Sequence, residues 1–285
     1  NLGRSVANAH TTFKIIEVLF MFPCTPLVVA LTEKIIPGED QKVHHNELQY
    51  ITEISLKSPA TMIPQAKNEL KRMADMAQEN LDRSIKGFLN QSDEYLNKIY
   101  HREEDINNVS HAITDYLVKS NQLSLPLADQ KILGSMFYVV NDIERIGDHA
   151  ENFADYTKTE LKHNTGLTGD AKEEIKKMYE AVSKLLKLSL ESFMAQDGVN
   201  TQEDKLAEIA ALEASIDKME RRYQKHHIKR LAKGDCEPRA GLLFSDMLSE
   251  LERIADHSVN IAYSMSDEDE DEMLAAENEA LATNN

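Results

Sequence analysis

One charged segment occurs twice in this chain, and it limits the folds that the chain can adopt. Residues 144–154 read ERIGDHAENFA, and residues 252–262 read ERIADHSVNIA. The two copies share Glu, Arg, Ile, Asp, His, Asn and Ala in the same register. Such a recurrence indicates an internal duplication, so the fold must contain the same structural unit twice.

Each copy has the spacing of an amphipathic helix. Apolar and small residues recur every three to four positions from Ile143 to Ala154, and again from Leu251 to Ala262. These positions fall on one face when successive residues are rotated by about 100°. The duplicated segment is therefore predicted to be a helix that buries one face.

Each copy also carries two carboxylates four residues apart. They are Glu144 and Asp148 in the first copy, and Glu252 and Asp256 in the second. At this spacing the side chains stack on one side of the helix, where like charges repel each other. A solvated acidic face is the simpler interpretation of one such pair. The repetition gives equal weight to a second interpretation, in which each pair holds a hard or borderline metal cation.

The arginine inside each copy is not expected to neutralise these carboxylates. Arg145 and Arg253 point about 100° away from the acidic side of the helix. Each follows another acid by three residues, Asp142 in the first copy and Glu250 in the second. We therefore expect each arginine to pair with that acid.

The histidines are expected to have other roles than metal binding. His149 and His257 follow the two aspartates directly, so they too point about 100° away from them. We do not assign either one to the metal. His226 and His227 are predicted to face solvent.

The composition places the chain among all-α proteins. Tryptophan is absent and aromatic residues make up 6%, while strong helix formers such as Ala, Leu, Glu, Lys and Met are abundant. The net charge of -17 would repel nucleic acids, so no nucleic-acid partner is expected. Cys24 and Cys236 show neither metal-site nor disulfide spacing.

Apolar periodicity and capping signals predict six helices. Their expected ranges are 58–90, 92–120, 124–164, 170–195, 201–233 and 238–266. The strongest break, at 164–169, separates two sets of three. We therefore expect two tandem three-helix bundles, at 58–165 and 166–266, each with one copy of the duplicated segment.

The regions on either side of the bundles differ from them in composition. Residues 15–31 are mostly apolar, so 1–37 are predicted to contain a helix that either spans a membrane marginally or packs as a core helix. Residues 38–57 are predicted to be a polar linker, and the acidic residues 267–285 a disordered tail. Because the chain begins at Asn1 and not at methionine, we expect it to be a piece of a longer protein.

The second helix of each bundle carries a matching pair of polar residues. Aligning the copies places Glu103 and Asn107 opposite Glu213 and Asp217, again four residues apart. Antiparallel packing could bring each pair beside the duplicated carboxylates of the same bundle. One metal site per bundle is thus predicted, and the second is expected to bind more strongly because Asn107 replaces a carboxylate in the first. Oxygen ligands favour iron, manganese or magnesium, and zinc stays open.

The duplicated motif resembles a known family. Residues 141–148, NDIERIGD, and 252–256, ERIAD, are similar to the repeated Glu/Asp-x-x-x-Asp element of PhoU-like proteins. The resemblance covers about residues 58–266 and implies paired three-helix bundles in a regulator of phosphate transport. It also implies metal, with multinuclear iron clusters in some members, which makes iron the first choice here.

The residues before the first bundle resemble part of a larger group of proteins that contain such a domain. Residues 9–13, 48–51 and 58–60 look like the joint in sodium/phosphate cotransporters that carry a C-terminal PhoU-like domain. This implies a metal-binding regulatory module that modulates phosphate uptake. Residues 38–285 would be cytoplasmic, attached at the cell inner membrane to a transporter domain of the same polypeptide, whose upstream core binds phosphate and sodium. A homodimer stays open.

Two other classes of function compete with this one. The first is a freestanding PhoU-type phosphate-signalling adaptor, which differs in having no membrane spans encoded upstream of Asn1. The second is a ferritin-like di-metal enzyme, which needs two Glu-x-x-His elements. That spacing suits a metal site only at Glu160 to His163, and no nucleophile motif, glycine-rich phosphate loop or zinc motif is present. We therefore expect no enzymatic activity.

Overall fold

The structure is a computed structural model. It describes residues 12–14, 48–52, 59–163, 166–195 and 199–264. The chain divides into two compact units, Asn1–His45 and Asn46–Asn285, and all six labelled helices belong to the second. The apolar stretch 15–31 and the acidic tail 267–285 lie outside the described residues. Within the described ranges, no helix is both long and apolar enough to cross a membrane.

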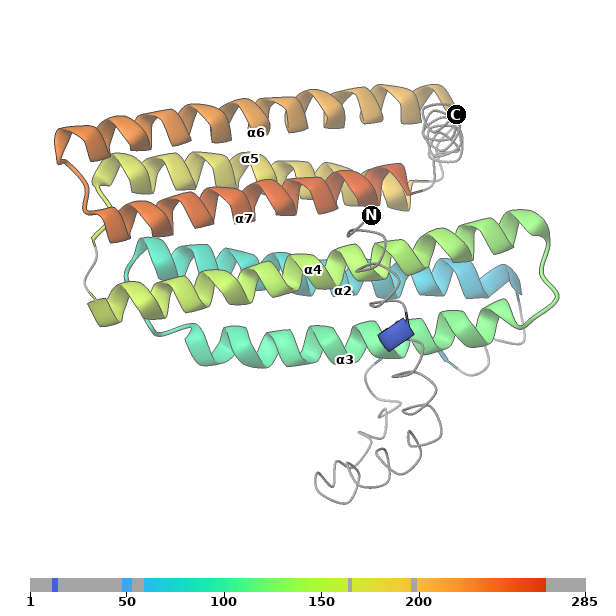
Figure 1. The fold of residues 1–285 in the computed structure, drawn as a ribbon. Helices are drawn as coiled ribbons and strands as arrows, with labels where there is room; N and C mark the ends of the chain where they lie inside the picture. The colour runs from blue at the N-terminus through green and yellow to red at the C-terminus, as the bar shows by residue number, and fades with distance from the viewer. Residues whose placement is uncertain (1–11, 15–47, 53–58, 164–165, 196–198, 265–285) are drawn as a thin grey trace, which may run out of the picture. The chain divides into compact units, whose positions relative to one another are not determined.

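Six long helices account for most of the described residues (Figure 1). They are α2 (Pro59–Leu89), α3 (Leu96–Asn121), α4 (Leu127–His163), α5 (Gly169–Met194), α6 (Val199–Lys233) and α7 (Pro238–Tyr263). Each lies within a few residues of its predicted range, which confirms the all-α class. The start of α5 differs slightly from the prediction at Asp170, because the hydroxyl of Thr168 accepts the N–H of Ala171 at 3.2 Å, so Thr168 is the N-cap and α5 begins at Gly169.

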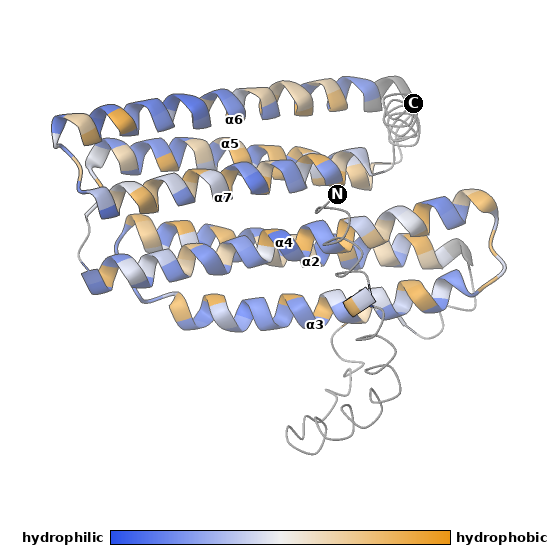
Figure 2. Cartoon of the chain, viewed as in Figure 1, coloured by the Kyte–Doolittle hydropathy of each residue, from blue (hydrophilic) through white to orange (hydrophobic). Residues whose placement is uncertain are grey.

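The helices pack in two sets of three. In the first set α2, α3 and α4 pack against one another, and in the second α5, α6 and α7 do so. Apolar faces meet inside each set, where Phe88, Phe153 and Phe244 are fully buried. Figure 2 shows hydrophobic and hydrophilic residues alternating along each helix, as amphipathic packing requires. The sets also meet through α4 with α7 and α2 with α5, within one unit, so the predicted domain boundary at residues 165 and 166 remains a prediction.

One buried lysine joins the two sets. Lys67 of α2 is 8% exposed, and its Nζ donates to the carbonyl oxygen of Phe193 at 2.9 Å, near the end of α5. Nζ also lies 5.0 Å from the centroid of the Phe193 ring. Burial lowers the pKa of Lys67. The helix C-terminus and the ring face both attract positive charge, so they offset part of the cost of burial.

A buried glutamate holds a short segment against α2. Glu69 is 0% exposed, and its Oε2 accepts the backbone N–H of Gln49 at 2.9 Å and that of Tyr50 at 2.7 Å. Ile51, which is 8% exposed, joins the hydrophobic core. Residues 48–52 therefore pack with the helices, although their polar composition predicts a linker.

A fragment of residues 46–266 should be more stable than one of residues 57–266. Both should fold, because every helix retains its apolar face. The shorter fragment loses two hydrogen bonds to the carboxylate of Glu69, so its free energy of unfolding should be lower by about 2–4 kcal/mol. Urea denaturation followed by circular dichroism measures this difference.

Two variants of the longer fragment control for the role of Glu69. Glu69→Gln should lose part of the same stability, because a neutral amide accepts weaker hydrogen bonds. Glu79→Gln, at an exposed position of the same helix, should lose less, because the ion pairs of Glu79 with Arg83 and Arg102 are largely solvent-exposed. Equal stability of the two fragments would contradict the packing of residues 48–52.

Candidate functional site

A buried carboxylate from α3 lies directly against a glycine of α4. Glu103 is 3% exposed, and among the described residues neither of its carboxylate oxygens has a hydrogen-bond partner. A Cβ placed on Gly147 would lie 2.8 Å from Oε2 and 3.3 Å from Oε1 of Glu103. The glycine therefore leaves the space that the carboxylate occupies, whereas the second copy of the segment has Ala255 at this position.

Other carboxylates surround Glu103. Burial raises the pKa of Glu103 to about 8, and repulsion by Asp148, Glu151 and Glu144 adds to the rise. The structure thus brings together three of the predicted residues and adds Glu151, which was not among them. The fourth predicted residue, Asn107, also has a buried side-chain oxygen without a partner in the described residues. We call Glu103, Glu144, Asp148 and Glu151 the first acidic cluster.

The second set of helices has a matching group of acids. The second acidic cluster consists of Glu213, Asp217 and Glu220 of α6 with Glu252 and Asp256 of α7. Burial raises the pKa values of Glu213, Glu252 and Asp256, and repulsion among these side chains adds to the rise. Each of the four residues predicted for the second site therefore lies close enough to influence at least two of the others.

The two clusters differ in burial and in neutralisation. Every carboxylate of the second cluster is half-buried or exposed, and Asp217 pairs with Arg221 at 3.1 Å. In the described part of the chain, the carboxylates of the first cluster have no such ion pair, and Glu103 is buried among them. The predicted ranking of the second site above the first depends on the number of carboxylates. The structure adds Glu151 to the first cluster and Glu220 to the second, so the second still has five carboxylates and the first has four, and the ranking remains a prediction.

The donor set of the first acidic cluster suits a hard cation. Carboxylate oxygens are the preferred ligands of such ions. The two unpartnered oxygens of Glu103 are buried acceptors that a cation would satisfy. Among the residues that the structure describes, no three His, Cys, Asp or Glu side chains converge closely enough as they stand to hold a metal ion. Metal binding by the predicted residues therefore remains a proposal.

Two histidines join α4 to α7 through reciprocal ion pairs. His149 of α4 pairs through Nδ1 with Glu250 of α7. His257 of α7 pairs through Nδ1 with Oδ1 of Asp142 of α4, at 2.8 Å. Because an ionised carboxylate can only accept, each Nδ1 donates the hydrogen bond. The two copies of the duplicated segment therefore contact each other through equivalent residues.

These pairs correct the sequence-based assignment of the arginines. The sequence predicts that Arg145 pairs with Asp142 and Arg253 with Glu250, and this prediction is wrong. The two acids face the partner helix, where a histidine of the other copy meets each one. Within the described ranges, neither guanidinium has a hydrogen bond or an ion pair.

Further hydrogen bonds surround both acids. Asn152 Nδ2 donates to Glu250 Oε2 at 3.1 Å, and the hydroxyl of Tyr156 donates to Glu250 Oε1 at 3.2 Å. The matching Asn260 donates to Asp142 Oδ1 at 3.4 Å. Burial alone would raise the pKa of Glu250, but its hydrogen bonds from the histidine, asparagine and tyrosine hold the pKa below its ordinary value. Glu250 is therefore an ionised, fully engaged carboxylate.

The other two histidines are not both turned to solvent. His227 is 5% exposed, and a Cβ placed on Gly241 of α7 would lie 2.5 Å from its Cε1. His226 pairs with Glu174 of α5 at 2.7 Å, and Glu174 also pairs with Arg230 at 2.9 Å. The prediction that both histidines face solvent is wrong, because α6 packs against α5 and α7 at this level.

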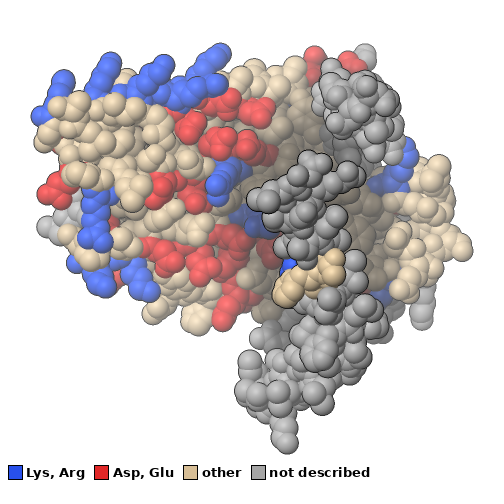
Figure 3. Space-filling view, viewed as in Figure 1, with Lys and Arg blue, Asp and Glu red and all other residues tan. Residues whose placement is uncertain are grey.

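A hollow of about 380 Å³ opens between α4 and α7. It is lined by Arg145, Asp148, His149, Glu151, Asn152, Arg253 and His257. Two of these side chains belong to the first acidic cluster, and two are the histidines that join the helices. Figure 3 shows acidic side chains gathered on one face over α4 and α7, with basic side chains among them.

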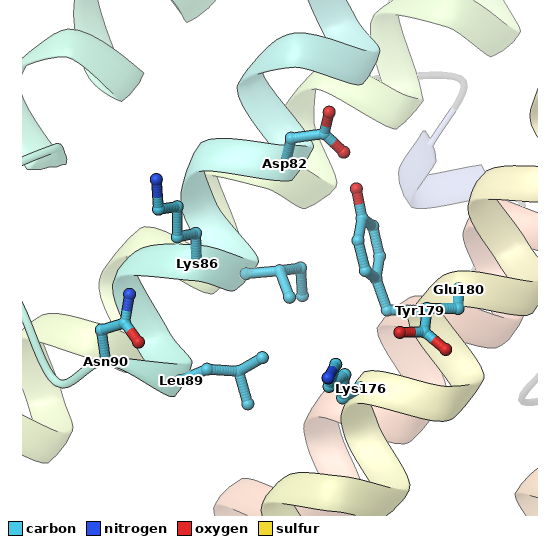
Figure 4. A pocket seen from close by; sticks show the side chains of 8 residues that line it. Asp82, Lys86, Leu89, Asn90, Lys176, Tyr179 and Glu180 are labelled. Carbon is cyan, nitrogen blue, oxygen red and sulfur yellow. The ribbon is translucent and has the colours of Figure 1, made fainter.

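Another hollow, of about 290 Å³, lies between α2 and α5 (Figure 4). The ring of Tyr179 stands in it with its hydroxyl toward Asp82, and Ile85 and Leu89 form an apolar side. Among the described residues, this buried hydroxyl has no hydrogen-bond partner. Burial and repulsion by Glu79 raise the pKa of Asp82. None of the lining residues belongs to the predicted sites.

The chain is similar to known proteins over both sets of helices. The sequence model of the PhoU domain matches residues 70–157 and 175–265, together more than half of the chain. The chain is 20% identical over 196 residues to the phosphate-specific transport system accessory protein PhoU homolog 1 of Thermotoga maritima, covering 68% of this chain and 82% of that protein. It is 23% identical over 199 residues to the corresponding PhoU homolog of Clostridium acetobutylicum, covering 69% and 87%. The structure resembles the crystal structure of PhoU from Pseudomonas aeruginosa, with a TM-score of 0.64 and 19% identity, covering 72% and 96%.

Glu103→Gln should change how the stability of the metal-free protein depends on pH. The pKa of Glu103 rises from 4.5 to about 8 on folding, so the folded state holds this proton more tightly than the unfolded state. The stability contributed by the protonated group is full below the unfolded value and is lost as the pH rises through the folded value. Relative to the variant, the free energy of unfolding of the wild type should fall by about 3–5 kcal/mol across this window.

Urea denaturation with a chelator, between about pH 5 and pH 8, measures this difference. Glu104→Gln is the matched control, because Glu104 is the next residue of α3 but has a side chain that is 78% exposed. The control should follow the wild type. If the stability of Glu103→Gln depends on pH in the same way as that of the wild type, the pKa of Glu103 is not raised on folding.

Proposed function

Because the chain belongs to the PhoU domain family, we propose that it regulates phosphate transport and catalyses no reaction. The observation that carries the proposal is the match of the family model to each set of helices in turn, with one acidic cluster inside each match. The two sequence relatives are accessory proteins of phosphate-specific transport systems, which supports the proposal. The partner is accordingly a phosphate transport system.

Each acidic cluster is proposed to hold a divalent or ferric metal ion as part of this role. Iron is preferred, and manganese, magnesium and zinc are the other candidates. A bound cation supplies the positive charge that the crowded carboxylates lack. The ligands of each cluster come from two helices, α3 and α4 in the first set and α6 and α7 in the second. Occupancy would therefore favour one packing of each pair, as a ligand must in order to shift a conformational equilibrium.

The comparisons favour the freestanding form of this regulator over the attached form. The chain covers 82% and 87% of two accessory-protein relatives, so it contains most of what such a protein needs. Attachment to a sodium-dependent transporter domain at the inner membrane depends on residues 1–37, nearly all of which lie outside the described ranges. The sequence encoded upstream of Asn1 distinguishes the two forms, because only the attached form requires membrane spans there.

Asp148→Ala combined with Asp256→Ala should reduce the amount of bound metal. Each substitution removes one carboxylate from a cluster, and the loss of a charged ligand should weaken binding about tenfold or more. Elemental analysis of tag-free protein after incubation with iron or manganese measures the metal content. Asp115→Ala, at an exposed position of α3, is the matched control. Unchanged metal content in the double variant would return these residues to the interpretation of a solvated acidic face.

Cells that carry Asp148→Asn and Asp256→Asn should still take up phosphate but should no longer adjust uptake to the phosphate supply. We expect this because the clusters are proposed to belong to a regulator, so their loss leaves the route of phosphate through the transporter intact. Uptake of labelled phosphate by starved and replete cells measures both properties, with Asp115→Asn as the control. If uptake and its regulation are unaltered under every phosphate and metal condition, the clusters have a structural role only.

A further inference from the structure

We infer that the hollow between α4 and α7 binds a multivalent oxyanion through Arg145, Arg253 and His149. This site differs from the proposed metal sites, although Asp148 and Glu151 of the first acidic cluster form part of its lining. Oxyanion binding by the arginines and the histidine does not depend on the proposed function, whereas its strengthening by a cation rests on the metal site proposed there. Only its meaning as an input to phosphate transport rests on that function.

Two arginines at matching positions of the duplicated helices line the hollow. Arg145 comes from α4 and Arg253 from α7. Both are exposed, and in the described part of the chain neither has a hydrogen bond or an ion pair, because histidines occupy the nearby acids. A guanidinium presents its N–H groups in a planar fork that matches two oxygens of a phosphate. Two such forks on two helices suit a ligand with several charged oxygens.

A buried histidine nitrogen in the lining lacks a partner. His149 is 7% exposed and its Nδ1 is engaged by Glu250, but among the described residues its Nε2 has no hydrogen-bond partner. Buried polar atoms nearly always have one. The ring of His257 lies beside it, with 5.6 Å between the ring centroids, and is held by Asp142. Nε2 of His149 is therefore a polar atom of the lining residues that a hydrogen-bonding ligand would satisfy.

Two acids in the lining decide the conditions under which an anion binds. Asp148 and Glu151 face the same hollow and would repel a bare anion. They also belong to the first acidic cluster, so a cation held there would remove this repulsion. The oxyanion should therefore bind more tightly when a divalent cation is present. The charge of Arg253 also acts on Glu252, which makes Arg145 the arginine less engaged by other acids.

The hollow is large enough for either of two ligands that carry the same oxyanion group. At about 380 Å³ it falls within the range of small-molecule sites, about 300–1,000 Å³. Free orthophosphate fits together with bridging waters, and so does the phosphate group of a small metabolite. Either ligand would join α4 to α7, and thus one helix of each set to one helix of the other.

Titration calorimetry of the full chain with orthophosphate tests the inference. The protein is titrated in a buffer of low chloride, first with a chelator and then with manganese. The wild type should bind orthophosphate, and more tightly with manganese. Arg145→Gln and Arg253→Gln should each weaken binding about tenfold, and the double variant should show no binding. Arg239→Gln, an exposed arginine of α7 outside the hollow, should bind as the wild type does.

The variants and the other titrants make the outcomes decisive. Circular dichroism should show intact helices in every variant, because both arginines are exposed and unpaired within the described residues. Glycerol phosphate and sulfate are titrated in parallel, and binding of any of the three that is lost in the double variant supports the site and identifies the source. No binding to the wild type under any condition, or equal binding to the double variant, would overturn it. If the aspartate variants lose regulation of uptake while the wild type binds no oxyanion, this result would refute only the present inference. If the wild type binds the oxyanion but the aspartate variants regulate uptake normally, only the proposed function would be refuted.

Discussion

The arrangement of the two helix sets depends on the two histidine–carboxylate pairs between α4 and α7. Glu250 is 9% exposed and Asp142 7%, so each pair places a charged acid inside the protein. An unpaired charge at such a depth costs several kcal/mol, roughly, whereas a paired and hydrogen-bonded one is tolerated. Each duplicated helix supplies one histidine and one acid. Both acids are satisfied only when the two copies face each other in a single register, so the pairs specify how the sets dock.

The same contact links docking to the acidic clusters. Asp148 and His149 are consecutive residues of α4, as Asp256 and His257 are of α7. Asp148 belongs to the first cluster and also lines the hollow toward α7, Asp256 belongs to the second cluster, and the histidine that follows each aspartate contacts the other set. A shift of α4 against α3 therefore moves the docking contact directly, without an intervening element. The acidic clusters and the interface between the two sets are therefore connected through adjacent residues of one helix.

Local pattern was sufficient to predict the helices and the grouping of the acids, because both follow from periods of three to four residues. Pairing across the interface could not be predicted in the same way. The spacing of Arg145 after Asp142 favours a pair within one helix, but the acid instead meets a histidine 115 residues away. Gly147 fits the apolar face in sequence, yet its role is to leave space for Glu103, which only the packing of α3 on α4 reveals. Glu151 lies outside the repeated spacing of four and gives no signal of its own.

The exchange of Gly147 for Ala255 makes the two halves of the duplication chemically unequal. The glycine allows a carboxylate to sit deep enough to keep its proton near neutral pH, while the acids beside Ala255 are half-buried or exposed. A cation that enters the first cluster would have to displace that proton, as metal binding to an acidic ligand requires. Uptake there would be coupled to acidity, and uptake in the second cluster less so. Under the proposed metal binding, a single missing methyl group would give the two clusters separate thresholds for cation uptake, and one chain would respond over a wider range of conditions.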